Sequence, residues 1–160
     1  MSDSLDHNDF MREVISLAIE NVESGRGGPF GALVVRDGEI IARGTNRVTT
    51  EHDPTAHAEV VAIRGACAAI DDFELTRCTL YTSCEPCPMC MGAVYWARLD
   101  RVVYASTRAD AAEAGFDDHH IYEELARPPA ERRIPMKQML REEGQQAFNA
   151  WLDFEGRVEY

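Results

Sequence analysis

The sequence predicts an α/β fold in which helices cover a mixed β-sheet. Short apolar segments alternate along the chain with longer stretches of helical periodicity, which is the pattern of strands that alternate with helices. A chain of 160 residues with 45% hydrophobic side chains is long enough to bury the core of one domain. We therefore expect a single domain over residues 1–160.

The first elements are a helix and a β-hairpin. A helix is expected from Phe10 to Val22, because its apolar residues follow the i, i+4, i+7 spacing of one helix face and Ser24-Gly25 ends it. Asp37-Gly38 is a signal for a two-residue hairpin turn. The apolar segments on either side, 32–35 and 40–43, are therefore predicted to pair as strands.

The middle of the chain is predicted to alternate between helix and strand. Helices are expected at about 57–70 and 88–97, and strands at 79–82 and 102–105. Functional sites in such sheets form beyond the strand ends, where loops meet helix N-termini. Two motifs that carry metal-binding residue types, at 57–59 and 86–90, are predicted to lie there.

The last third of the chain is expected to hold a short helix at 109–114, a loop at 115–120 and a final helix at 145–154. Residues 134–140 are compatible with either a fifth strand or part of a helix. Three residues form the apolar side of the final helix: Phe148, Trp151 and Leu152.

Two short motifs, His57-Ala58-Glu59 and Pro86-Cys87-Pro88-Met89-Cys90, carry metal-binding residue types. A catalytic zinc site takes three nitrogen or sulfur ligands and leaves the fourth position to water. Two cysteines three residues apart converge on one ion where a loop turns into a helix, whose N-terminus also favours the thiolate. We predict that His57, Cys87 and Cys90 bind one zinc ion per chain.

Spacing alone does not decide which cysteine pair is used, because Cys84 and Cys87 are also three residues apart. We favour Cys87 and Cys90, since they follow Pro86 and can begin a helix, whereas Cys84 lies at the end of a strand. The alternative is a closed structural site that uses His57 and all three cysteines, but it leaves Glu59 without a role.

The cysteine content also indicates a reducing compartment. Five cysteines, an odd number, occur in a chain whose first residues, 1–6, show no signal-peptide pattern. We therefore expect a cytoplasmic protein without disulfides. The absence of a long apolar run argues against a membrane span.

Glu59 and Asn46 are candidates for catalysis and substrate binding. A carboxylate beside a metal-activated water can take its proton and pass it to a substrate ring. Considered alone, Glu59 would be interpreted as a solvated residue in the first turn of a helix. Its position beside His57 and the paired cysteines favours catalysis instead. The Asn46 amide offers a donor and an acceptor to the edge of a base, although asparagine is also common in turns.

The formal net charge of −12 favours a small substrate over a nucleic acid. Nucleic-acid-binding proteins normally carry a basic face that neutralises phosphates. Here Lys137 is the only lysine, and the arginines are scattered. We therefore expect neither a nucleic-acid partner nor a membrane partner.

The string His-x-Glu … Pro-Cys-x-x-Cys is the signature of zinc-dependent nucleobase deaminases, and the chain resembles the bacterial guanine deaminases of the cytidine-deaminase-like superfamily. The resemblance runs nearly end to end. It is carried by these segments: Gly27 to Ala32, Asp53 to Glu59, Tyr81 to Cys90, Tyr95 to Arg98, Asp110 to Asp118, Glu131 to Pro135, and Tyr160. It implies a three-layer α/β/α fold with a central mixed five-stranded sheet.

The resemblance also implies an activity and a set of site residues. The reaction would be hydrolysis of guanine to xanthine and ammonia, in purine catabolism, with zinc on His57, Cys87 and Cys90 and with Glu59 and Asp118 as catalytic residues. Six residues would contact the substrate: Asn46, Ala58, Phe30, Trp96, Phe116 and Tyr160. A homodimer is implied, in which the segment from about 145 to 160 is exchanged and brings Tyr160 to the partner's site.

Other functions stay open at the level of sequence. Relatives of this group deaminate guanosine or ammeline, so the substrate is less well determined than the chemistry. A tRNA adenosine deaminase would need a phosphate-binding surface that the acidic composition disfavours, and a cytosine deaminase is a further possibility. A zinc-stabilised interaction module would require a closed four-ligand site.

Overall fold

The computed structural model describes residues 7–160 and divides into two compact units. The first unit ends at Asp118, and the second runs from His119 to Tyr160. The first six residues, on which the expectation of a chain without a signal peptide rests, lie outside the described part. The first unit holds all of the candidate site residues except Tyr160.

The first unit is built on a mixed four-stranded sheet with the order β2-β1-β3-β4. β1 (Gly31–Arg36) pairs antiparallel with both β2 (Glu39–Thr45) and β3 (Cys78–Cys84). β4 (Arg101–Ser106) runs parallel to β3. The β1–β2 hairpin turns at Asp37 and Gly38, which both have positive φ, as the Asp-Gly pair predicts.

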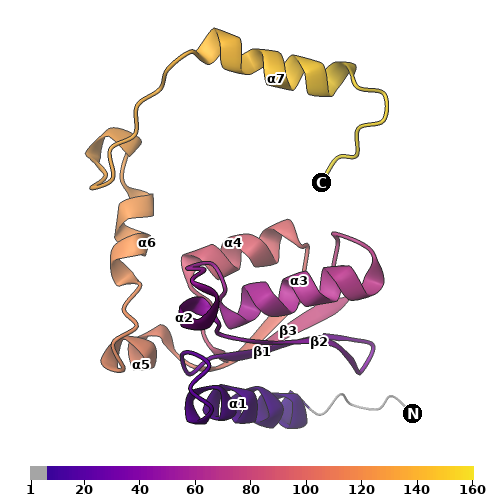
Figure 1. The fold of residues 1–160 in the computed structure, drawn as a ribbon, viewed down its shortest axis with the longest axis vertical. Coiled ribbons are helices and arrows are strands. Elements are labelled where there is room, and N and C mark those ends of the chain that lie inside the picture. The colour runs from indigo at the N-terminus through magenta and orange to yellow at the C-terminus, as the bar shows by residue number, and fades with distance from the viewer. Residues whose placement is uncertain (1–6) are drawn as a thin grey trace. The chain divides into compact units, whose positions relative to one another are not determined.

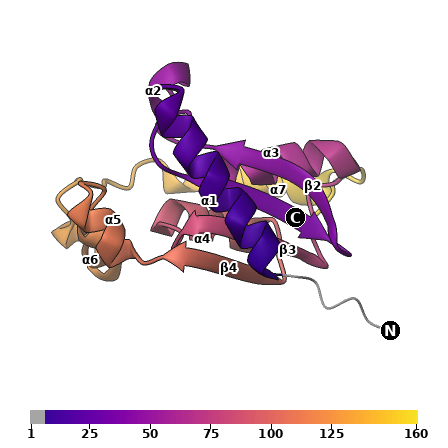
Figure 2. The ribbon, with the colours of Figure 1, turned by 90° about the horizontal axis from the view of Figure 1, so that it is seen from below.

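Helices cover both faces of this sheet and make three layers within residues 7–118, as Figures 1 and 2 show. α1 (His7–Glu23) packs on one face, while α3 (Ala58–Ile70) and α4 (Pro88–Trp96) pack on the other. The core has two corresponding parts, one under α1 around Leu33 and Tyr81 and one under α3 and α4 around Val34 and Leu80. Successive side chains of β1 point to opposite faces of the sheet, so this strand contributes to both parts of the core.

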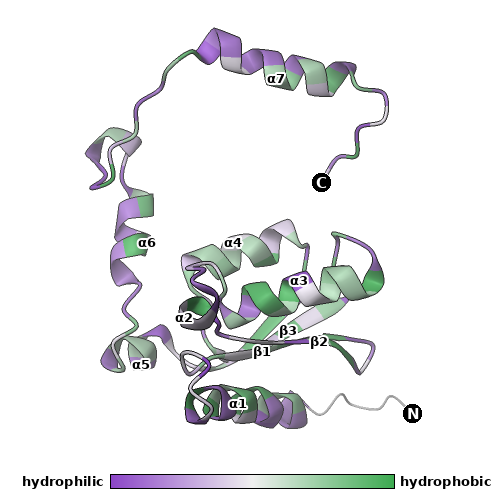
Figure 3. Cartoon of the chain, in the orientation of Figure 1, coloured by the Kyte–Doolittle hydropathy of each residue, from purple (hydrophilic) through white to green (hydrophobic). Residues whose placement is uncertain are grey.

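The two faces differ in the character of their helices. Figure 3 shows hydrophilic and hydrophobic residues alternating along α1, whereas α3 and α4 are mostly hydrophobic. α1 therefore buries one stripe, which includes Val14 and Ala18, and exposes the rest. α4 follows β3 and leads to the parallel strand β4, which makes a β-α-β crossover.

Gly44 sets the position of α3 against the sheet. A Cβ atom at Gly44 would lie 2.1 Å from the Ala58 carbonyl oxygen and 2.6 Å from the Ala62 amide nitrogen. Strand β2 therefore contacts the backbone of the first turns of α3 directly, which only glycine permits. This contact fixes the helix end that carries His57.

Two short helices complete the first unit. α2 (Val48–Glu51), which the sequence reading did not anticipate, follows β2 by two residues. α5 (Arg108–Glu113) matches the predicted helix and begins with a capping box, in which Thr107 and Asp110 exchange side-chain and backbone hydrogen bonds. These helices flank the ends of β2 and β4.

The second unit contains α6 (His119–Ala126), a short 3₁₀ helix η1 (Pro129–Glu131) and α7 (Arg141–Asp153). The prediction of a loop through residue 120 is wrong for its last two residues, because α6 begins at His119. α7 confirms the final helix but begins four residues earlier than expected, at Arg141 rather than Gln145.

The predicted fifth strand is not formed in the described residues. Residues 134–140 are neither strand nor helix, and the sheet of residues 7–160 has four strands. A strand requires a neighbouring edge for its amide and carbonyl groups, and the second unit contains no strand that could supply one. None of the helices in residues 7–160 has the length and the apolar composition needed to cross a lipid bilayer.

Candidate metal centre and active site

His57, Cys87 and Cys90 converge on one point of the first unit. The Nδ1 atom of His57 lies 3.5 Å from the Cys87 sulfur and 3.4 Å from the Cys90 sulfur, and the three ligand atoms all lie within 4.8 Å of one another. Tetrahedral zinc with Zn–S bonds of about 2.3 Å and Zn–N bonds of about 2.0 Å places nitrogen and sulfur about 3.5 Å apart. The donor set and its spacing therefore fit zinc.

Two helix N-termini hold these ligands. His57 is the N-cap of α3 and Cys87 is the N-cap of α4, and Pro88 occupies the first turn of α4. The Cys87 sulfur accepts a hydrogen bond from the Cys90 amide over 3.5 Å, so the C-x-x-C spacing closes the first helical turn around the sulfur. Helix N-termini favour negative charge, which suits a pair of thiolates.

The cluster makes one thiol unusually acidic. The pKa of Cys87 falls to about 4, first because the Cys90 thiol donates a hydrogen bond to it, then because His57 and the Cys90 amide do. The same hydrogen bond from Cys90, together with burial and the Glu59 charge, raises the pKa of Cys90. The hydrogen bond with Cys87 also raises the pKa of His57. A divalent cation bound between the two sulfurs favours the thiolate form of both, because metal binding releases the thiol protons.

Cys84 stands outside this cluster. Its thiol donates to the Thr107 carbonyl over 3.6 Å, and burial raises its pKa to about 11, so it is a poor thiolate ligand. Within residues 7–160, only His57, Cys87 and Cys90 are grouped as metal ligands. A zinc site with three protein ligands is typical of catalysis, because its fourth position is available to water.

Glu59 lies in the first turn of α3 with only 5% of its surface exposed. Burial is the main cause that raises the pKa of its carboxyl, and the negative charge of Cys87 adds to the effect. Its Oε1 accepts a hydrogen bond from the Thr82 hydroxyl over 3.4 Å. A buried carboxyl with a raised pKa, next to a metal cluster, is suited to hold a proton and return it.

The predicted residues Phe30, Phe116 and Asp118 are also found in this unit. The rings of Phe30 and Phe116 pack edge to face, with centroids 5.0 Å apart, although 86 positions separate them in the sequence. Burial and the charge of Cys87 raise the pKa of Asp118, which places this carboxyl within electrostatic range of the metal ligands.

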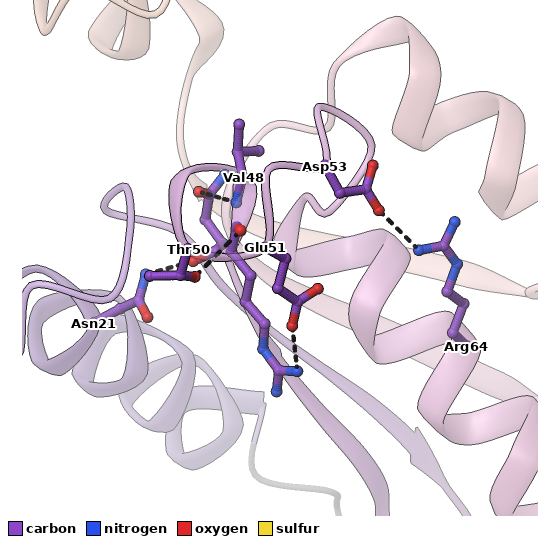
Figure 4. A network of polar contacts seen from close by, with 8 residues as sticks. Asn21, Val48, Thr50, Glu51, Asp53 and Arg64 are labelled. Carbon is purple, nitrogen blue, oxygen red and sulfur yellow. Dashed lines mark hydrogen bonds and ion pairs between the residues drawn. The ribbon is translucent and has the colours of Figure 1, made fainter.

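Asn46 is held with its amide in one orientation. Its Oδ1 accepts hydrogen bonds from the amides of Gly28 and Val48, both over 3.3 Å, and its backbone amide donates to the Phe30 carbonyl. Two donors occupy the oxygen, so the Nδ2 amino group remains to meet a ligand. Figure 4 shows Val48 at the start of α2, close to Thr50 and Glu51 of the same helix.

Ala58, Trp96 and Tyr160 differ in their burial and in their position in the fold. The Ala58 side chain is fully buried, so only its backbone could face a ligand. Trp96 ends α4, about 13 Å along the helix axis from Cys87, and its surface is 65% exposed. Tyr160 belongs to the second unit and is 69% exposed. Within the first unit, one group of contacts joins the three metal ligands, and another joins Asn46, Phe30 and Phe116.

The sequence reading missed two side chains that support the site, Thr82 and Asn21. Thr82 contacts Glu59, and Asn21 donates hydrogen bonds to the segments that hold Asn46. A signal for Asn21 existed, because it lies seven residues after Val14 and three residues after Ala18, on the same helix stripe. A polar residue on a buried helical stripe needs a partner in the core.

Comparison with known proteins shows which family this chain matches. Residues 4–106 match the cytidine and deoxycytidylate deaminase zinc-binding region. The guanine deaminase of Bacillus subtilis (strain 168) is 54% identical over 156 residues, which cover 98% of this chain and 100% of that protein. Its X-ray structure superposes with a TM-score of 0.95, over 97% of this chain and 99% of that one.

Two further relatives are similar over a shorter range. The tRNA-specific adenosine deaminase of Bacillus subtilis is 44% identical over 97 residues, which cover 61% of this chain and 60% of that protein. A crystal structure in complex with 2,6-diaminopurine is 40% identical, covers 68% of this chain and 61% of that chain, and has a TM-score of 0.66. The similarity to the Bacillus guanine deaminase covers nearly all of this chain and so includes most of the second unit, whereas the two shorter matches cover 61% and 68% of the chain.

Proposed function

The chain belongs to the cytidine and deoxycytidylate deaminase family, and we propose that it is a zinc-dependent aminohydrolase that converts guanine and water to xanthine and ammonia. The observation that carries the chemistry is the buried Glu59 carboxyl beside three converging zinc ligands. The choice of guanine is supported by the guanine deaminase that matches this chain over its full length.

Glu59 carries the protons of the reaction. When bound, zinc acts as a Lewis acid that makes a water molecule more acidic. Glu59 accepts a proton from the water whose oxygen bonds to C2 of guanine, and it returns that proton to the neighbouring ring nitrogen. The second water proton leaves with the 2-amino group as the C2–N bond breaks, delivered by Glu59 or Asp118. The raised pKa of each carboxyl, which burial causes first, favours its taking up a proton and passing it on.

The purine is held by residues around this carboxyl. Asn46 presents its Nδ2 amino group to an acceptor on the purine edge, and the rings of Phe30 and Phe116 form an aromatic wall. Ala58 contributes its backbone, and Trp96 and Tyr160 contribute further aromatic surface. Asp118 accepts from the 2-amino group that leaves. These contacts rest on the family resemblance together with the positions of Asn46, Phe30 and Phe116.

Tyr160 reaches a site by exchange between two chains. We infer a homodimer in which the segment from about 145 to 160 docks on the partner, so that the chain acts as a single deaminase domain per subunit. Exposed apolar side chains on α7, which include Phe148 and Leu152, are suited to such docking. Reduced cysteines and thiolate ligands suit a cytoplasmic location.

A substrate panel tests the proposal. Zinc-loaded protein is assayed for ammonia release with guanine, guanosine, adenine and cytosine, and kcat/KM is compared. Adenine lacks the 2-amino group, so its kcat/KM should be lower by a factor on the order of 10⁴. Cytosine should also be a poor substrate, because it is too small to fill the space beside the rings of Phe30 and Phe116. A preference for guanosine would overturn the choice of guanine but keep the zinc chemistry.

Binding to tRNA is tested separately with a gel-shift assay. The formal net charge of −12 predicts no shift at physiological salt, because few cations are available to neutralise phosphates. A shift together with adenosine deamination in the tRNA would instead favour the activity of the partial relative from Bacillus subtilis.

A further inference from the structure

Asn21 is a buried polar residue in the last turns of α1. Its exposed surface is 0%, and it lies on the stripe that buries Val14 and Ala18. Burial of an amide is unfavourable unless its polar atoms find partners. The contacts of Asn21 therefore indicate what it does for the fold or the site.

The Asn21 amino group joins two segments of the candidate site. Nδ2 donates to the Gly28 carbonyl over 2.8 Å and to the Asn46 carbonyl over 2.9 Å. Both partners are acceptors, so only the amino end of the amide can face them. Figure 4 shows Asn21 pointing from its helix toward the loop after β2.

The segment around Asn46 is built for close approach. A Cβ atom at Gly27 would lie 2.1 Å from the Asn46 carbonyl oxygen and 3.1 Å from Nδ2 of Asn21, so only glycine fits there. Gly28 receives one hydrogen bond from Asn21 through its carbonyl and gives one to Oδ1 of Asn46 through its amide. Asn21 thus holds both the backbone of Asn46 and the residue that orients its side chain.

The end of α1 does not need the Asn21 side chain. The Ser24 hydroxyl and the Arg26 amide both donate to the backbone carbonyl of Asn21. These bonds would survive replacement of the side chain, because they use only the main chain. A role in ending the helix therefore does not account for the buried amide.

We propose that Asn21 is a positioning residue, which locks Asn46 so that its Nδ2 amino group faces the purine. The proposal rests on the proposed function, in which Asn46 contacts the substrate. Without the two Asn21 hydrogen bonds, the Gly28 and Asn46 segments are held together less firmly, and the Gly28 amide that donates to Oδ1 of Asn46 can shift. The substrate would then meet a mobile amide, which weakens binding more than it slows the chemical steps at Glu59.

The kinetic test compares Asn21→Ala and Asn21→Asp with Val14→Ala as a control. Val14 is buried in the same helix but packs on Leu33, Val35 and Tyr81, so its truncation loosens α1 without touching Asn46. Asn21→Ala should raise KM for guanine by about tenfold, the size of one lost hydrogen bond, with kcat changed by less than about threefold and zinc content unchanged. Asn21→Asp, which turns an oxygen toward the two carbonyls, should have at least as large an effect.

A double-mutant cycle with Asn46→Ala separates positioning from a structural role. If Asn21 acts through Asn46, the KM effect of Asn21→Ala disappears in the Asn46→Ala background. Effects that multiply independently would overturn the proposal, as would a KM change in Val14→Ala equal to that of Asn21→Ala.

Amide hydrogen exchange measured by NMR gives a readout that needs no substrate. The amides of Asn46 and Val48 should exchange faster in Asn21→Ala than in wild type, while Val14→Ala leaves them unchanged relative to the rest of the sheet. Unchanged protection in Asn21→Ala would refute the positioning role. If wild-type protein fails to deaminate guanine, the proposed function is wrong, and the exchange result still decides whether Asn21 holds Asn46.

Discussion

The Thr82 hydroxyl lies 3.4 Å from the Glu59 carboxylate and 3.1 Å from the Cys84 carbonyl, and it is almost completely buried. A hydroxyl has one proton to donate, so it is shared between the carboxylate and the carbonyl. Thr82 thereby connects the carboxyl of Glu59 on α3 to the end of β3, just before the loop that carries Cys87. One side chain thus holds the proton carrier against the end of the strand that precedes the metal ligand Cys87.

Removing this hydroxyl should slow the reaction without loss of zinc. Thr82→Val keeps the shape but removes a hydrogen bond worth about 0.5–1.5 kcal/mol, which corresponds to roughly a 2- to 13-fold fall in kcat. Thr82→Ser should restore most of the rate, and Thr79→Val in the same strand serves as the control. Metal analysis with steady-state kinetics checks this, and zinc loss in Thr82→Val would show that the hydroxyl supports the metal cluster instead.

Glu59→Gln should abolish most of the activity while the protein stays zinc-loaded. The amide keeps the size of the side chain but cannot carry a proton, so turnover should fall by about 10²–10⁴-fold. Zinc content measured by atomic absorption should stay at one per chain, because Glu59 does not belong to the metal cluster. Near-normal turnover in this variant would remove Glu59 from the mechanism.

Cys84 and Cys87 should respond differently to replacement by alanine. Cys87→Ala removes one of three ligands and should strip zinc after dialysis, because two protein ligands hold the ion poorly. Cys84→Ala should retain it, since the Cys84 thiol faces the Thr107 carbonyl. Equal zinc loss in the two variants, measured side by side, would mean that the ligand assignment is wrong.

Gly44→Ala should destabilise the first unit. The new Cβ atom would collide with the backbone of Ala58 and Ala62, and such overpacking costs about 1–3 kcal/mol in the free energy of unfolding. Gly92→Ala on α4 is the matched control, because nothing lies within 4 Å of its Cβ position and alanine is favoured by about 1 kcal/mol in a helix. Urea denaturation of both variants checks the opposite signs.

Removal of residues 155–160 should reduce activity and leave the first unit folded. The proposed exchange of tails brings Tyr160 to the partner's site, so the truncated protein should bind zinc normally and turn over guanine more slowly. Circular dichroism and metal analysis report on the fold and the zinc site, and kcat/KM reports on the site. Full activity would show that Tyr160 reaches no active site.

Local pattern was enough to place most elements and to limit the metal ligands to a few candidates. The apolar spacing of α1, the Asp37-Gly38 turn and the Pro88 helix start all depend on neighbours in the sequence, and each is found close to where it was predicted. The types of ligand also follow from local motifs, because zinc chemistry restricts them to a few residue types. Three elements, α2, α6 and η1, were not predicted, and the expected fifth strand is absent from the described residues.

Long-range packing decided what local pattern left open. Cys84 and Cys90 lie at the same spacing from Cys87, and only the turn from β3 into α4 points Cys90 toward His57 and Cys84 toward Thr107. The meeting of Phe30 with Phe116 likewise depends on where distant segments pack.

The same holds for Thr82 and Asn21, whose partners are 23 and 25 positions away. The sequence determines which chemical groups a segment carries and how far apart they are along the chain, and both are local properties. Which of them face one another depends on helix phase, strand order and the close approach allowed at Gly44, because these set the distances between residues far apart in the chain.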